Sequence, residues 1–293
     1  MENFELKSFD GYVLNCYLYD TVEKPKGIVQ IVHGMKEHGA RYDGFCKKLN
    51  KLGFIAFVSD LRGHGTNVRV EDLGQGENLY ENSVKDQIFI SEYLTKKYKK
   101  LPLFVFGHSY GSFISQRYIE LCNLSKRVVL SGTAFSGDFS FKMGKMLANI
   151  QSKFVNPTKH AKIIEKVGIG SYGKGFAGGN WLTKDEKEWE KYKKDELCGT
   201  DFPISFYKAM FNGFTKVNKY LGDIDKDTKV LLVVGSLDPV GNKTKGVKQV
   251  EEKLNQNGVN ARTIVYENCR HEVHNDKERD TLLKDIVNFY LEK

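Results

Sequence analysis

The stretch LPLFVFGHSYGS (101–112) places a serine at the junction of a predicted strand and a predicted helix. Within it Gly107, Ser109 and Gly111 form the pattern GxSxG, with an apolar run before the pattern and a helical pattern (112–122) after it. A serine at such a sharp turn projects its hydroxyl from the sheet edge, and the flanking glycines relieve backbone crowding. The stretch therefore predicts a nucleophilic serine at a strand-to-helix turn.

A serine hydroxyl becomes a nucleophile only when a base removes its proton, and that base needs a carboxylate to orient it. Both partners are expected after later strands, in the chain order serine, aspartate, histidine. Asp238 follows the predicted strand 229–234, and His271 follows the predicted strand 262–266. We therefore predict a catalytic set of Ser109, Asp238 and His271.

Two other residues compete for these roles. Asp60 also follows a predicted strand, but it precedes the serine and stands close to Arg62, which favours a structural ion pair. His274 comes three residues after His271, near the start of the last predicted helix, and we interpret it as a surface or packing residue.

The oxyanion of an acyl-transfer intermediate needs two backbone N–H donors. One belongs to the residue after the nucleophile, here Tyr110, and the other to a loop after an earlier strand. The turn HGMKEHG (33–39) follows the predicted strand 27–32 and offers Met35 as that second donor. We predict an oxyanion hole formed by the backbone N–H groups of Met35 and Tyr110.

Strand patterns and helix patterns alternate along most of the chain. Strands are predicted at 12–19, 27–32, 54–58, 103–106, 128–130, 230–234 and 262–266, and helices at 42–52, from Ser83 onward, and at 112–122, 244–256 and 276–291. This alternation predicts an α/β fold with a mostly parallel sheet and helices on both faces. Residues 137–220 break the rhythm with two amphipathic helical patterns, so we expect a core of 1–136 and 221–293 interrupted by a mainly helical cap at 137–220.

Composition excludes several classes of protein. With 40% hydrophobic and 28% charged residues among 293, the chain is far too apolar to be disordered. Its longest apolar runs have the length of strands, so no transmembrane segment is predicted. The start MENFELKSFD lacks a basic-then-apolar leader pattern, and a cytoplasmic location is expected. Five scattered cysteines predict neither a disulfide framework nor a cysteine-rich zinc site.

The net charge of +8 lies mostly in the expected cap, which holds 15 lysines and nine acidic residues. No motif of interleaved aromatic and basic residues encourages a nucleic-acid partner, so none is expected. Within the cap, 139–155 has apolar residues at helical spacing and lysines at 142, 145 and 153. This helix either buries one face on the core, or it lines an acyl tunnel or rests on a lipid surface with its lysines near anionic headgroups.

Two stretches resemble known motifs but lack the flanking structure or the spacing that those motifs require. The stretch GIGSYG (168–173) matches GxGxxG, but no strand precedes it and more glycines follow, so we interpret it as a mobile cap loop. His271 and His274 are three residues apart, whereas the HExxH zinc motif needs a spacing of four. The sequence therefore predicts no cofactor and no metal.

Several motifs together resemble one family. They are HGMKEHGARY (33–42), DLRGHG (60–65), GHSYGS (107–112), GSLDPVG (235–241), YENCRHEVHND (266–276) and the cap segment NWLTKDEKEWEKYKKDELCG (180–199). This series resembles the serine hydrolases of the α/β-hydrolase superfamily, and within it the monoacylglycerol lipase and lysophospholipase-like branch. The resemblance implies the α/β-hydrolase fold, and it implies the same catalytic and oxyanion residues. Tyr110 and Ser112 depart from the methionine and glycine usual in the family, which affects the expected shape of the acyl pocket.

The function expected from these residues and this resemblance is hydrolysis of a small-molecule or lipid ester through an acyl-serine intermediate, with monoacylglycerols or lysophospholipids as substrates. A general carboxylesterase, a thioesterase or an aminopeptidase of the same fold stays open, because all acyl transfers use this machinery. A different class, a non-catalytic sensor that binds an ester-like ligand, also stays open.

Overall fold

The computed structural model describes residues 1–137 and 139–292. Asp138, near the start of the predicted cap, and Lys293, at the end of the predicted core, lie outside the described residues.

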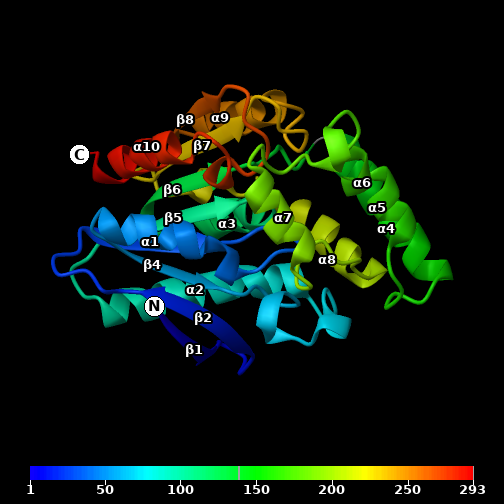
Figure 1. The fold of residues 1–293 in the computed structure, drawn as a ribbon, viewed down its shortest axis with the longest axis horizontal. Coiled ribbons are helices and arrows are strands. Elements are labelled where there is room, and N and C mark those ends of the chain that lie inside the picture. Colours follow the sequence, from blue (N-terminus) through cyan, green and yellow to red (C-terminus); the bar gives the residue numbers. More distant parts are fainter. Residues whose placement is uncertain (138, 293) are drawn as a thin grey trace.

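A single eight-stranded sheet forms the centre of the described molecule (Figure 1). The strands are β1 (Glu2–Lys7), β2 (Val13–Tyr19), β3 (Gly27–Val32), β4 (Phe54–Ser59), β5 (Leu103–His108), β6 (Ser125–Ser131), β7 (Lys229–Gly235) and β8 (Asn260–Tyr266). Their order is β1-β2-β4-β3-β5-β6-β7-β8. β1 pairs antiparallel with β2, and β2 pairs antiparallel with β4, while every pairing from β4 to β8 is parallel. The predicted mostly parallel sheet is confirmed.

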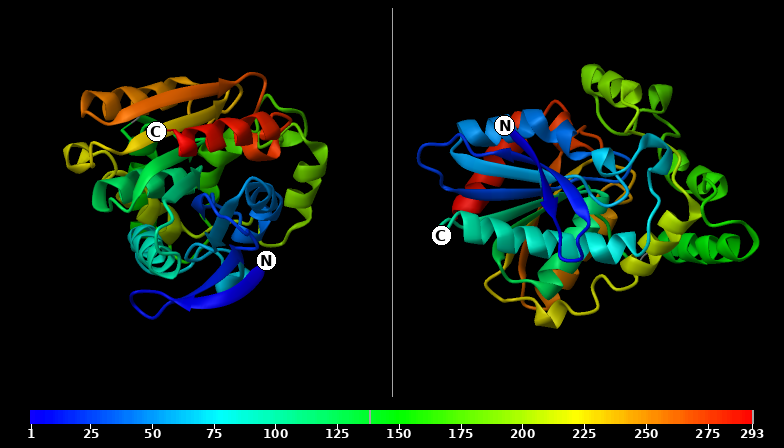
Figure 2. Two further views of the ribbon diagram at one scale, coloured as in Figure 1. Left: turned by 90° about the vertical axis from the view of Figure 1, so that its left-hand side faces the viewer. Right: turned by 90° about the horizontal axis from the view of Figure 1, so that it is seen from below.

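Helices cover both faces of the sheet, which explains why its central strands are apolar on both sides (Figure 2). One face packs against α1 (Asp43–Lys51) and α10 (Arg279–Leu291). The other face packs against α2 (Leu79–Lys97), α3 (Tyr110–Leu121) and α9 (Lys245–Gln256). All six residues of β3 are buried, and so are all six of β5. The strand that leads to Ser109 is therefore held rigidly from both sides.

The chain between β6 and β7 is helical and lies at one end of the molecule (Figure 1). Its helices are α4 (Phe139–Phe154), α5 (Lys162–Val167), α6 (Ile169–Tyr172), α7 (Glu186–Lys194) and α8 (Ile204–Phe214). We call residues 139–220 the cap segment. The cap segment contacts the loop after β8, where the Trp181 carbonyl accepts a hydrogen bond from the His271 N–H at 3.4 Å.

Three sequence expectations about local structure were wrong. The edge strand β1 was not predicted; its residues are exposed or half-buried, so it lacks the apolar run of an inner strand. Helix α2 begins at Leu79, not near Ser83, and its first turn buries Leu79 and Tyr80 in the core. The GxGxxG stretch, predicted as a loop, contains the short helix α6.

Within the described ranges, no helix is both long enough and apolar enough to cross a membrane. All five cysteines are free thiols.

Candidate active site

The turn between β5 and α3 holds Ser109 in a strained conformation. Its φ is 50° and its ψ is −120°, a region that non-glycine residues rarely adopt and that costs about 1–3 kcal/mol. The glycines on either side are required by close packing. A Cβ on Gly107 would overlap the Ser115 side chain, and a Cβ on Gly111 would overlap the Val32 carbonyl. This strained turn therefore places the half-buried Ser109 directly after β5.

Asp238 and His271 come together behind this turn. The carboxylate Oδ2 of Asp238 accepts a hydrogen bond from Nδ1 of His271 at 2.9 Å, and both side chains are buried. The other carboxylate oxygen, Oδ1, accepts the backbone N–H of Val240 at 2.9 Å. Burial alone would lower the pKa of His271, but the charge and hydrogen bond of Asp238 raise it above its usual value of 6.5. The Nε2 atom of His271 has no hydrogen-bond partner among the described residues.

The predicted oxyanion donors lie beside the serine. A Cβ on Gly34, the residue before Met35, would stand 3.2 Å from Cβ of Ser109, so this turn passes close to the serine. Tyr110 is the first residue of α3 and has no preceding helical carbonyl to bind. Among the residues that the structure describes, neither the Met35 N–H nor the Tyr110 N–H donates a hydrogen bond to a backbone carbonyl of a turn or loop.

A cavity of about 460 Å³ joins these groups, a volume typical of ligand sites. Ser109, His271, Met35 and Tyr110 all border it. Asp238 does not, because it lies behind His271. The rest of the wall is mainly apolar, and much of it comes from cap helices α4 and α8, including Met143, Met146, Leu147, Ile150, Met210 and Phe214.

A buried ion cluster, not predicted from the sequence, joins the turn that carries Met35 to the loop that carries His271. The Arg41 guanidinium binds both oxygens of Glu272 at 2.9 and 2.8 Å, and it also pairs with Glu37. Glu37 accepts the N–H of Gly34, and Glu272 directly follows His271. Burial by itself would raise the pKa of Glu272, but Arg41 lowers it to about 2. The cluster therefore fixes the turn that carries Met35 relative to the loop that carries His271.

We expect Arg41→Met to destabilise the fold by about 3–5 kcal/mol, because it leaves two carboxylates buried without their counter-charge. Denaturant unfolding at neutral pH measures this loss. As the pKa of Glu272 is about 2 when folded against an ordinary 4.5, its pairing contributes fully above pH 5 and is lost as pH falls toward 2. The loss in Arg41→Met should therefore be largest near neutrality. The triple variant with Glu37→Gln and Glu272→Gln is the control and should recover much of the stability; equal loss in both variants contradicts the pairing.

The competing residues have structural roles. The Asp60 carboxylate accepts the N–H groups of Gly39 and Thr66 at 2.7 and 2.9 Å. The predicted pairing of Asp60 with Arg62 is wrong, because Arg62 binds Asp10 and Asp86 instead. The Thr66 hydroxyl also donates to Oδ2 of Asp60 at 3.0 Å, so the Asp60 carboxylate binds groups of its own turn.

His274 is a packing residue, one of the two roles predicted for it. It is buried, and its ring lies 4.6 Å from the His108 ring and 5.0 Å from the Tyr42 ring. Burial lowers its pKa to about 4, so it is neutral near pH 7. A neutral, enclosed ring at this position supports the His271 loop.

Trp181 is a site residue that sequence reasoning missed. Its ring lies 4.9 Å from the ring of His271, and both border the cavity. The next residue, Leu182, accepts the backbone N–H of Glu272 at 2.7 Å. Nothing in the spacing of the cap residues indicates that they pair with a loop 90 residues away.

The parallel sheet, the strained serine after its central strand and the buried carboxylate–histidine pair define an α/β hydrolase. Residues 23–278 match the model of the hydrolase family described as serine aminopeptidase, S33. The chain belongs to that family, and the predicted α/β-hydrolase fold and serine hydrolase class are confirmed.

Individual relatives match nearly the whole chain. A monoglyceride lipase homolog of monkeypox virus is 22% identical over 288 residues, which cover 96% of this chain and 93% of that protein. The monoglyceride lipase of Rattus norvegicus is 25% identical and covers 92% and 84%. The crystal structure of a thermostable carboxyl esterase from Bacillus coagulans, in complex with glycerol, has a TM-score of 0.88 at 26% identity and covers 98% and 97%. These relatives belong to the lipase and esterase group that the sequence motifs resemble.

Proposed function

We propose that this protein hydrolyses carboxylic esters of monoacylglycerol or lysophospholipid type through an acyl-serine intermediate. The observation that carries the proposal is the mainly apolar cavity with Ser109 and His271 on its wall. An acyl chain fits such a wall, and the ester then lies beside the serine. The monoglyceride lipases among the relatives favour the same substrate class.

In the proposed reaction, Oγ of Ser109 attacks the ester carbonyl while Nε2 of His271 takes its proton. The backbone N–H groups of Met35 and Tyr110 hold the oxyanion, and one such donor is worth about 3–4 kcal/mol. Collapse of the intermediate breaks the ester C–O bond, and His271 returns the proton to the leaving alcohol. A water, activated by His271, then attacks the acyl-serine and releases the fatty acid and the free hydroxyl of Ser109.

A panel of esters tests the substrate class. It contains monoacylglycerols and lysophospholipids of graded chain length, short-chain aryl esters, a thioester and an aminoacyl amide. We expect kcat/KM to rise with chain length until the cavity is filled. Activity confined to short esters would replace the lipase proposal with a general carboxylesterase. No turnover combined with no labelling of Ser109 by a fluorophosphonate would favour the non-catalytic sensor.

The cavity argues against an aminopeptidase. A substrate ammonium group needs an unpaired carboxylate, and the acidic residues at the cavity wall within the described part of the chain, Glu37 and Glu272, are both bound to Arg41. The aminoacyl amide in the panel is therefore expected to turn over far more slowly than the esters.

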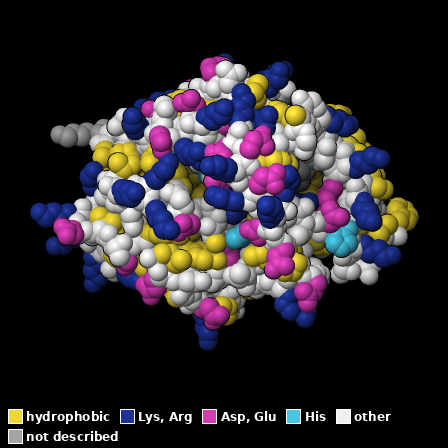
Figure 3. Space-filling view, viewed as in Figure 1, with side chains coloured by type: hydrophobic (Ala, Val, Ile, Leu, Met, Phe, Trp, Pro, Cys, Tyr) yellow, Lys and Arg dark blue, Asp and Glu magenta, His cyan; other side chains and the backbone are white. Residues whose placement is uncertain are grey.

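We further propose that residues 137–220 act as a cap on a core of 1–136 and 221–293, and that this cap touches anionic lipid. On α4 and α5 the apolar side chains of Phe139, Phe154 and Val167 are 76%, 83% and 67% exposed. Figure 3 shows hydrophobic and basic side chains together at the end of the molecule where these helices lie. Lys142, Lys145 and Lys153 border one shallow pocket on α4.

Vesicles containing phosphatidylglycerol test this contact. Changing Lys142, Lys145 and Lys153 to glutamine should weaken binding on the order of 100-fold, because each lysine near such a surface contributes about 1 kcal/mol. The matched control changes three exposed lysines of the core helices, Lys248, Lys253 and Lys284, and should bind nearly as the wild type does. Equal weakening in both triple variants would reduce the effect to net charge and reject a cap contact.

A further inference from the structure

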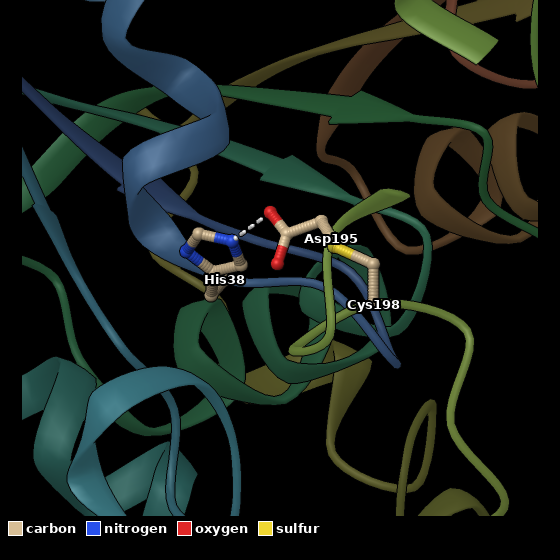
Figure 4. Close-up of side chains that lie close together, drawn as sticks. All are labelled: His38, Asp195 and Cys198. Atoms are coloured by element: carbon tan, nitrogen blue, oxygen red, sulfur yellow. Dashed lines mark hydrogen bonds and ion pairs between the residues drawn. The ribbon is translucent and has the colours of Figure 1, made fainter. Parts of the chain in front are cut away.

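A histidine, an aspartate and a cysteine meet where the cap segment touches the core (Figure 4). His38 lies in the turn 33–39 that also carries Met35, whereas Asp195 and Cys198 come just after α7. Nε2 of His38 lies 2.8 Å from Oδ2 of Asp195. One ligand atom from each of the three side chains lies within 4.8 Å of the others. We propose that these three residues form a binding site for Zn²⁺.

The three donors suit a borderline-soft divalent ion. Zn²⁺ binds imidazole nitrogen, thiolate sulfur and carboxylate oxygen, and three protein ligands plus a water complete a tetrahedron. Bond lengths of about 2.0–2.3 Å imply ligand atoms about 3.3–3.7 Å apart. The imidazole–carboxylate pair, 2.8 Å apart, must therefore open slightly to admit the ion between the three ligand atoms, which lie within 4.8 Å of one another. Hard ions such as Mg²⁺ prefer oxygen donors alone, so this donor set disfavours them.

Charge also suits the ion. When Zn²⁺ binds, the Cys198 thiol releases its proton to solvent, and the thiolate and the Asp195 carboxylate together balance the two positive charges. His38 contributes a neutral imidazole. The nearby cation Arg41 is already neutralised by Glu37 and Glu272, so the ion does not meet an unpaired positive charge there.

The backbone holds the two cap ligands in place before any ion arrives. The N–H of Leu197 donates to Oδ1 of Asp195 at 3.0 Å, and the N–H of Cys198 donates to the Asp195 carbonyl at 3.0 Å. The His38 side chain is 8% exposed, whereas that of Asp195 is 31% exposed. The carboxylate therefore stands at the entrance, and the imidazole and thiol lie inside.

The second nitrogen of His38 sets the expected affinity. Nδ1 is buried and has no hydrogen-bond partner among the described residues. A metal-binding histidine usually donates this N–H to an acceptor, and losing that partner typically weakens binding 10–100-fold. We therefore infer a reversible site, not a permanent structural one.

Occupation of this site fastens the cap segment to the core. The same contact between the cap segment and the core already includes a hydrogen bond from the Gly199 N–H to the Lys36 carbonyl at 3.0 Å. Zn²⁺ adds three bonds next to it, two from the cap and one from the turn that carries Met35. We expect the ion to raise the thermal unfolding temperature and to slow opening of the cap.

Cobalt titration of the metal-free protein tests the site, because Co²⁺ occupies tetrahedral zinc sites and reports its ligands by absorption. We expect one Co²⁺ per chain, with a thiolate charge-transfer band in the near ultraviolet, displaced by one equivalent of Zn²⁺. Cys198→Ala should abolish the band, and Asp195→Asn, at a partly exposed position, should weaken Zn²⁺ binding at least 10-fold. Cys122→Ala, which removes a half-buried thiol elsewhere, is the control and should bind as the wild type does.

Two outcomes overturn the proposal. The first is a Co²⁺ spectrum without a thiolate band in wild-type protein. The second is Zn²⁺ binding, or a Zn²⁺-dependent rise in unfolding temperature, that persists equally in Cys198→Ala and Asp195→Asn. Circular dichroism of both variants without metal verifies that they are folded.

Discussion

Ser109→Ala is expected to lower kcat for ester hydrolysis by about 10⁴-fold or more. Without the hydroxyl no acyl-serine can form, and only the oxyanion donors and substrate binding remain to accelerate attack by water. The fold should persist, because Oγ of Ser109 makes no hydrogen bond to another described side chain or backbone group. Steady-state turnover of a monoacylglycerol, fluorophosphonate labelling and thermal unfolding measure the three parts of this expectation.

Ser115→Ala is the matched control for that experiment. Ser115 lies in α3, six residues after Ser109, is buried, and donates to the Gly111 carbonyl at 2.8 Å. It does not border the cavity, so its removal should change kcat by only a few-fold. If Ser109→Ala retained turnover close to that of the wild type, the nucleophile would have to lie elsewhere.

Sequence alone located the catalytic candidates because their signals are local. Ser109, Asp238 and His271 each come within five residues of the end of a strand that could be recognised in the sequence, and parallel strands bring their carboxyl ends to one edge. The same local patterns placed the central strands and the helices between them to within a few residues. The fold class could therefore be predicted without knowing the order of the strands in the sheet.

Contacts between distant segments could not be predicted in this way. Arg41 binds Glu272, which lies 231 residues further along the chain, and His38 binds Asp195, 157 residues away. The sequence around a charged residue in a turn does not indicate which distant residue it pairs with. Asp60 is close to Arg62 in the sequence, but its carboxylate accepts backbone N–H groups instead. The sequence predicted no metal because His38 lies 157 residues before Asp195, so no local motif contains all three proposed zinc ligands.

The cap segment was the least predictable part of the fold. Two helical patterns were expected, whereas five helices occur in the described part of this segment. Helix α4 contains both apolar and charged residues, and only Ala148 among its described residues is buried. Its apolar face borders the cavity, so the alternative in which this helix lines a tunnel fits better than simple packing on the core.

Asp238→Asn is the second variant with a very large expected effect, a loss of about 10⁴-fold in kcat. The carboxylate accepts the Nδ1–H of His271, which leaves Nε2 free to take the proton of Ser109. An asparagine can instead donate its amide N–H to Nδ1, which places the proton on Nε2. In that tautomer His271 cannot act as a base, although its position hardly changes.

The same variant should also shift the pH dependence of the residual rate. His271 acts as a base only when neutral, so the wild-type rate falls as pH drops through its raised pKa. Without the carboxylate, burial dominates and lowers that pKa, so the acidic limb of kcat/KM should move to lower pH. Asp60→Asn is the control, since Asp60 is equally buried but binds backbone N–H groups. It should reduce stability and leave the acidic limb in place. An unshifted limb in Asp238→Asn would mean that another group orients His271, because loss of the carboxylate must change the proton affinity of the ring it touches.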